Sequence, residues 1–170
     1  MNNKTKNLAY AALIAALYVV LTHLQNFILP GSATWAIQCR IAEALCVLAL
    51  FTPAAVSGLT VGCLLFNLTY SAALPLDWLV GAAATLAATA AMRALRNVRV
   101  KGYPLLSMLM PALTNAILVG WELTVYIGGG FWLNALYVAL GELIVLLVIG
   151  SVILRIFETR GLDRRLFPAN

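Results

Sequence analysis

Six long apolar segments follow one another along the chain, with only short polar stretches between them. They cover residues 8–29, 33–51, 53–70, 76–95, 104–127 and 131–155. The core of a bilayer is about 30 Å thick, and a helix needs about 20 apolar residues to cross it. Hydrophobic residues make up 63% of the chain and charged residues 10%, far from the balance of a soluble domain. The sequence predicts an all-α membrane protein of six transmembrane helices, in one domain over residues 1–170.

Proline and glycine mark several of the boundaries between these segments. Pro30-Gly31-Ser32, Thr52-Pro53 and Gly128-Gly129-Gly130 are helix stop or start signals. The first apolar segment is longer than the core of a signal peptide and is not followed by a convincing cleavage site. We therefore expect it to remain as the first helix.

The basic residues predict the orientation of the helices. All eleven Lys and Arg residues except Arg40 lie before the first segment, from the end of the fourth segment to the start of the fifth, or from the end of the sixth onward. With six spans, these three stretches share one side of the membrane. Basic loops face the cytoplasm, so we expect both termini to be cytoplasmic. The stretches are short and lack an interleaved set of aromatic residues, which argues against nucleic-acid binding.

Most polar residues within the apolar segments fall in the half that faces outward. An ionisable side chain at membrane depth costs at least about 2.5 kcal/mol, so it tends to face a bundle interior or a wet cavity. Polar groups from five segments at one level indicate a pocket that opens outward, whereas a channel needs them along its full depth. The candidate substrate-binding residues are Gln38, Arg40, Glu43, Asn67, Asp77, Asn115, Trp121, Glu122, Tyr126 and Glu142.

Some of these residues also have simpler interpretations. Arg40 and Glu43 are three apart and could pair with each other, and Asp77 could stabilise a helix start. Trp78 could be an interfacial belt residue, and His23 could bond between helices. Four carboxylates face one arginine in the outward half. A cationic or donor-rich ligand would resolve that excess, as would protonation of the carboxylates.

Small residues predict close helix contacts. The first segment carries two overlapping small-xxx-small pairs, formed by Ala11, Ala12, Ala15 and Ala16, and the third carries Gly58-xxx-Gly62. Such faces let helices approach closely. The glycine pair is expected to pack within the bundle. The alanines lie in the cytoplasmic half, away from the polar residues, and are candidates for binding a partner protein.

The sequence contains no motif that indicates an enzyme. It has one histidine and lacks HExxH, GxSxG and the nucleotide-binding GxxxxGK[ST] pattern. The three cysteines have no paired spacing and are expected to be buried apolar residues. We expect no metal and no cofactor. Any energy source must then be an ion gradient or another subunit.

Several stretches resemble one known family. They are CRIAEALCVLALFTPAAVSGLTVGCLLFNL, LDWLVGAAATLAA, PALTNAILVGWELTVY and ALYVALGEL, in this order. They resemble the QueT family of queuosine-precursor transporters, the S components of energy-coupling factor (ECF) transporters. The resemblance implies a multi-pass protein of the bacterial cell membrane with an ECF S-component-like bundle. It also implies partners, namely the coupling subunit EcfT and two cytoplasmic ATPases, with the alanine face of the first helix as the docking face.

The same resemblance implies a 7-deazaguanine substrate, such as queuine or its aminomethyl precursor preQ1. A carboxylate can accept two hydrogen bonds from the guanine-like edge of such a ring. We assign this role to Glu122, with Asn115 beside it. Glu43 or Asp77 is expected near the amine of preQ1, and Arg40 could pair with Glu43 or donate to the ring oxygen.

Two further expectations concern the ring and the energy source. The ring is expected to stack on Trp121 or Tyr126. The alternatives are an S component for another vitamin-like solute and an autonomous proton-coupled transporter with Glu142 as the proton carrier.

Overall fold

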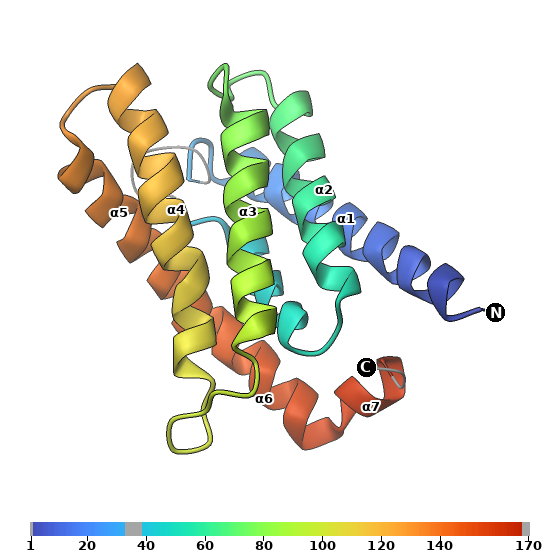
Figure 1. Ribbon diagram of the computed structural model, residues 1–170. Coiled ribbons are helices and arrows are strands. Elements are labelled where there is room, and N and C mark those ends of the chain that lie inside the picture. The colour runs from blue at the N-terminus through green and yellow to red at the C-terminus, as the bar shows by residue number, and fades with distance from the viewer. Residues whose placement is uncertain (1, 33–38, 168–170) are drawn as a thin grey trace.

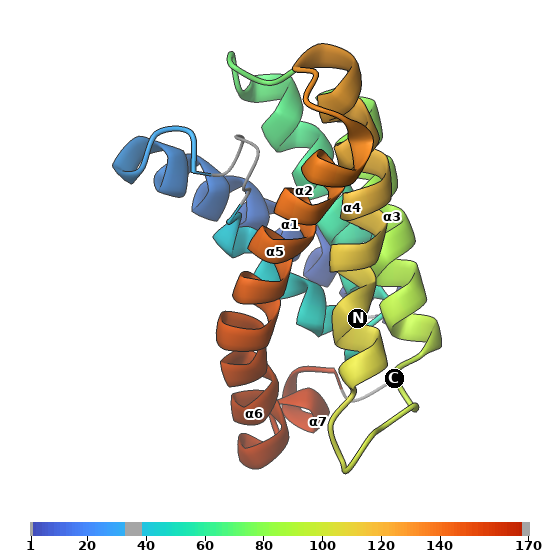
Figure 2. The same cartoon turned by 90° about the vertical axis from the view of Figure 1, so that its left-hand side faces the viewer.

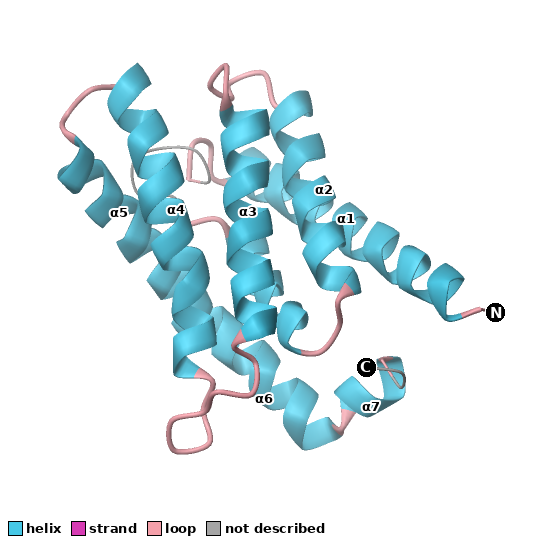
Figure 3. Cartoon of the chain, in the orientation of Figure 1, coloured by secondary structure: helices cyan, strands magenta, loops and turns pink. Residues whose placement is uncertain are grey.

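The computed structural model describes residues 2–32 and 39–167, which form helices joined by loops and contain no strand (Figures 1 and 3). The elements are α1 (Asn3–Ile28), the 3₁₀ helix η1 (Ile41–Leu50), α2 (Ala54–Thr69), α3 (Asp77–Ala94), α4 (Leu105–Tyr126), α5 (Phe131–Ile144), the π-helical stretch η2 (Val145–Gly150), α6 (Ser151–Arg160) and α7 (Leu162–Leu166). The expectation of an all-α chain is confirmed.

Helices α2, α3 and α4 each begin and end one residue inside the apolar segments from which they were predicted. Proline explains two of these starts, because Pro53 and Pro104 stand directly before α2 and α4. Within the described residues, three helical stretches are long and apolar enough to cross a membrane: Asn3–Ile28, Leu105–Tyr126 and Phe131–Arg160.

The second apolar segment differs from the helix predicted over 33–51. Residues 33–38 lie outside the described residues, and Cys39 and Arg40 are not helical. The side chain of Gln25 donates to the Cys39 carbonyl oxygen at 2.7 Å and accepts from the Ile41 backbone N–H at 2.7 Å. These bonds satisfy backbone groups that a helix would otherwise have to pair, so the chain can stay extended until Ile41.

The helix η1 lies inside the bundle, as the two views show (Figures 1 and 2). Eight of its ten residues are buried, all except Ile41 and Leu45. A 3₁₀ helix rises about 2.0 Å per residue, so η1 extends over about 20 Å. With α1, α2, α3, α4, η2 and α6 all in contact with it, η1 is the centre around which the longer helices pack.

Helix α1 packs against α2 through the predicted small residues. A methyl group on Gly58 would lie 2.6 Å from the Ala11 carbonyl oxygen, and one on Gly62 would lie 3.0 Å from that of Ala15. The glycine pair therefore packs within the chain. It packs against Ala11 and Ala15, two of the four alanines predicted to bind a partner protein. Of these four, only Ala12 and Ala16 are exposed.

The sixth segment continues as one helical run through α5, η2 and α6 to Arg160, beyond the predicted end at 155. The tail that follows is ordered rather than frayed. Gly161 adopts a left-handed conformation, with φ 61°, and lets the chain turn into α7. After α7, the ring of Phe167 packs edge-on against Tyr10 of α1.

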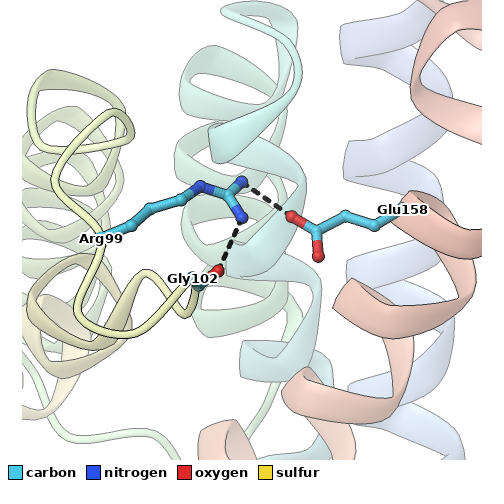
Figure 4. A network of polar contacts seen from close by, with 3 residues as sticks. All are labelled: Arg99, Gly102 and Glu158. Atoms are coloured by element: carbon cyan, nitrogen blue, oxygen red, sulfur yellow. Dashed lines mark hydrogen bonds and ion pairs between the residues drawn. The ribbon is translucent and has the colours of Figure 1, made fainter.

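The α3–α4 loop and the C-terminal helices meet at one end of the molecule, the lower end in Figure 1. Arg99 in the loop forms an ion pair with Glu158 of α6 at 2.7 Å and donates to the Gly102 carbonyl oxygen at 3.0 Å (Figure 4). Since Phe167 contacts Tyr10, the start of α1 lies near this end too. We call it the basic end, because it gathers the three basic stretches.

Candidate functional site

A cluster of buried polar side chains lies in the half of the molecule away from the basic end. Six helices, η1 among them, and the residue before η1 contribute to it. Its members are Tyr18 of α1, Arg40 before η1, Glu43 of η1, Asn67 of α2, Asp77 of α3, Asn115 and Glu122 of α4, and Glu142 of α5. All are buried except Asp77, which is half-buried. We call this set the polar cluster.

Tyr18 links the two charged residues that the sequence suggested as a pair. Its hydroxyl donates to Glu43 Oε1 at 2.5 Å and accepts from Arg40 Nη1 at 3.1 Å. The pairing of Arg40 with Glu43 therefore runs through a phenol from a different helix. This geometry ties α1 to η1 at the level of the cluster.

Two thiols and an aromatic ring complete the surroundings of these charges. Cys46 donates to Glu43 Oε2 at 3.1 Å, and Arg40 Nη1 lies 3.7 Å from Cys63 Sγ. The Arg40 guanidinium lies 5.4 Å from the centre of the buried Phe66 ring, a cation–π distance. With Tyr18 and Cys46 bound to it, Glu43 has a hydrogen bond at each oxygen.

Glu122, unlike Glu43, accepts no hydrogen bond within the described part of the chain. Its side chain is 0% exposed, and neither carboxylate oxygen has a hydrogen-bond partner among the described residues. Asp77 and Arg40 act on it electrostatically. A buried polar group without a partner costs free energy, so two such oxygens on one carboxylate mark a place where a ligand could supply the donors.

Asn115 and Glu142 form a second polar contact in the cluster. Asn115 Nδ2 donates to Glu142 Oε1 at 2.8 Å. Glu142 is 4% exposed, and its Oε2 has no hydrogen-bond partner within the part of the chain that the structure describes. Glu142 also lies within electrostatic range of Glu43 and Arg40. Glu142 therefore has one oxygen, Oε2, that could accept a hydrogen bond from a ligand, while Oε1 accepts from Asn115.

Asn67 and Asp77 connect α2 to the start of α3. Asn67 Nδ2 donates to the Asp77 carbonyl oxygen at 2.7 Å, while its buried Oδ1 has no partner in the described ranges. Asp77 Oδ2 accepts from the Leu74 backbone N–H at 2.6 Å. The simpler interpretation of Asp77, a residue that stabilises a helix start, thus describes one of its contacts.

The two aromatic residues proposed for ring stacking lie elsewhere. Trp121 is 50% exposed and Tyr126 40% exposed, so their rings lie on the outer surface of α4 rather than in the polar cluster. The buried rings at the cluster are those of Phe66 and Tyr18. The proposed residue Gln38 lies outside the described residues.

His23 forms a contact between helices, as the sequence suggested. Its Nε2 lies 3.0 Å from the Thr69 hydroxyl, and its ring packs edge-on against Phe66. Sequence reasoning missed Tyr18 as part of the site. A signal was present, because Tyr18, Thr22 and Gln25 follow one another at helical spacing on one buried stripe of α1.

No group of three or more residues suited to holding a metal ion occurs within residues 2–32 and 39–167. Apolar helices long enough to cross a membrane, together with a buried polar cluster between them, define the class as a helical membrane protein with a polar interior site.

A comparison with known protein families identifies the family of this chain. The family model described as QueT transporter matches residues 8–159, so the chain belongs to the QueT transporter family, as the resemblance of its sequence implied. Neither a curated protein nor a solved structure matches the chain.

Proposed function

We propose that this transporter captures a 7-deazaguanine, a queuosine precursor, from outside a bacterial cell as the S component of an ECF importer. The observation that carries the substrate class is the set of unpartnered atoms in the polar cluster. These atoms are both Glu122 oxygens, Glu142 Oε2 and Asn67 Oδ1, all of them buried acceptors. A ligand that fits them must bring donors, and a deazaguanine carries N–H groups and an exocyclic amine on a flat ring.

Within this proposal, Glu122 accepts the two donors of the guanine-like edge. A bidentate contact needs two free oxygens on one carboxylate, and Glu122 has them. Arg40 provides the positive charge of the cluster and can donate to the ring oxygen, while Tyr18 holds its guanidinium. Phe66, already against Arg40, offers an apolar face beside it.

The topology that we propose has six crossings with both termini in the cytoplasm. The gathering of the three basic stretches at one end supports it, because basic segments stay on the cytoplasmic side. In this arrangement η1, about 20 Å long, forms only part of the second crossing and lies inside the bundle, and the polar cluster lies in the outward half.

Cysteine labelling tests this topology. In a Cys39→Ser background, Lys101→Cys in the basic loop should resist a membrane-impermeant maleimide applied to intact cells, and Ser71→Cys should react. Both side chains are exposed and lie in loops at opposite ends. The reverse labelling pattern would contradict the orientation.

Titration calorimetry of the purified chain with queuine, preQ1, preQ0 and guanine tests the substrate class. Binding of at least one deazaguanine, and weaker binding of guanine, is expected. Absence of binding to all three deazaguanines would refute the class and favour an S component for another vitamin-like solute.

The energy source distinguishes the proposal from a proton-coupled transporter. Glu142 favours that alternative, because it is a buried acid with one oxygen unpartnered. Co-purification of EcfT and two ATPases with this chain, together with uptake that depends on ATP, would support the S component. Uptake that a protonophore abolishes while ATP is maintained would support the alternative.

A further inference from the structure

We infer that a groove between the N-terminal parts of α1 and α2 binds an anionic phospholipid, with its phosphate at Lys4 and an acyl chain between the two helices. The groove has a volume of about 370 Å³, and its lining includes Lys4, Leu8 and Ala11 of α1 and Pro53, Ala54 and Ser57 at the start of α2. We call it the α1–α2 groove. It shares no residue with the polar cluster, so the inference does not depend on the substrate.

Along α1, the groove changes from charged to apolar in the order in which a phospholipid does. Both helices begin toward the basic end (Figure 1). Lys4 lies in the first turn of α1, and Leu8 and Ala11 follow after four and three residues, a spacing that keeps all three on one face. The helix rises about 10 Å from Lys4 to Ala11. A lysine at the headgroup level with apolar residues deeper in the membrane matches a phosphate and the upper part of an acyl chain.

The deeper part of the groove suits a hydrocarbon chain. Leu8 is 70% exposed, although it is a large apolar side chain, while Ala54 is buried. The Ser57 hydroxyl donates to the Ala54 carbonyl oxygen at 3.2 Å, so an acyl chain leaves this donor paired. The remaining polar residue of the lining, Asn7, lies one turn from Lys4. Polar side chains therefore gather at the headgroup end.

The width of the α1–α2 groove favours an acyl chain over a helix of a partner protein. Spread over about 10 Å of α1, the volume of the groove leaves a cross-section of roughly 40 Å², about half that of a helix 10 Å wide. The exposed alanines Ala12 and Ala16, which we propose as the docking face, do not line the groove. Lipid and partner protein therefore have separate places on α1.

The charge of the basic end favours an anionic headgroup over a zwitterionic one. Its three stretches carry ten basic residues and only two acidic ones, Glu158 and Asp163, and Glu158 is paired with Arg99. Lys4 is exposed and has no ion-pair partner among the described residues. Basic residues near the membrane surface attract the anionic lipids of the cytoplasmic leaflet. Lys4 is the member of this set that lines the groove.

Native mass spectrometry of the purified chain tests the headgroup contact. From micelles with equal amounts of phosphatidylglycerol and phosphatidylcholine of identical acyl chains, the wild type should retain one phosphatidylglycerol in preference. Lys4→Gln should lower this preference about fivefold, the effect of one lysine near an anionic surface. The matched control is Lys101→Gln, at an exposed lysine of the α3–α4 loop outside the groove, which should keep the preference.

A second variant tests the acyl-chain contact. Ser57→Trp places a large ring in the α1–α2 groove and should abolish the retention of phosphatidylglycerol. Ala87→Trp, the same ring at an exposed position of α3, should retain the lipid as the wild type does.

Three outcomes would overturn the inference. The first is equal retention of the two lipids by the wild type, which decides the question even if a variant fails to fold. The second is an equal effect of Lys4→Gln and Lys101→Gln, because it would show attraction to the basic end as a whole. The third is retention that survives Ser57→Trp while uptake in cells is lost, which would assign the groove to a partner protein. Deazaguanine binding is measured separately, so none of these outcomes contradicts the proposed function.

Discussion

Ala12→Trp and Ala16→Trp are each expected to abolish uptake of the deazaguanine and to leave its binding to the purified chain unchanged. Both alanines are exposed on α1, whereas the neighbouring Ala15 is buried against α2. A small exposed face on a membrane helix permits a close approach by another helix, and a large side chain there prevents it. Transport assays in cells and calorimetry on the purified variants measure the two properties separately.

The matched control is Ala87→Trp, the same change at an exposed alanine of α3. It should leave uptake near the wild-type level, because α3 is not the proposed docking helix. Normal uptake in both α1 variants would refute a docking role for this face. Equal loss of uptake in Ala87→Trp would show that the bulk, rather than the position, is responsible.

Glu122→Gln is expected to weaken the binding of every deazaguanine by about tenfold to hundredfold. The variant replaces one of two acceptors by a donor that faces the ligand's own donors. Loss of a charge-assisted hydrogen bond costs roughly 1.5–3 kcal/mol, and each 1.4 kcal/mol is about a tenfold change in affinity. Calorimetry with preQ1 and preQ0 should show a similar loss for both ligands.

The same variant should not destabilise the ligand-free chain. Neither Glu122 oxygen has a hydrogen-bond partner among the described residues, and the Asp77 carboxyl opposes a charge on it, so the substitution breaks no hydrogen bond and relieves a like-charge contact. Its unfolding temperature without ligand should equal or exceed that of the wild type. Glu158→Gln, at an exposed acid of the basic end, is the control for the change in charge and should bind normally. Wild-type affinity of Glu122→Gln would falsify the assignment of the guanine-edge contact.

Much of the helical architecture was accessible from the sequence, because the bilayer and the backbone impose local rules. A long apolar segment forms a helix in order to satisfy its own backbone. Proline and glycine then mark the ends of such helices, as at Pro53 before α2 and at Gly128 after α4. The family was also accessible, since its ordered motifs extend over most of the chain.

The 3₁₀ conformation of η1 could not be predicted from the sequence. Apolar periodicity does not distinguish a 3₁₀ helix from an α-helix, and the extended backbone at Cys39 depends on a side chain 14 residues earlier. Gln25 provides that contact only once α1 packs beside the segment. The outcome is therefore a property of the tertiary structure.

By itself, the sequence determined that the chain is helical, that it belongs to a membrane, and that its basic stretches share one end, because hydrophobicity, helix stop signals and charge act locally. It also predicted that four of its six carboxylates gather in one half of the molecule. Only the tertiary structure decided which of them is free. Tyr18 and Cys46 donate to the two oxygens of Glu43, and Asn115 donates to one oxygen of Glu142. Neither oxygen of Glu122 has a hydrogen-bond partner among the described residues. Hydrogen bonds between distant segments make that distinction, and they exist only after the helices have packed.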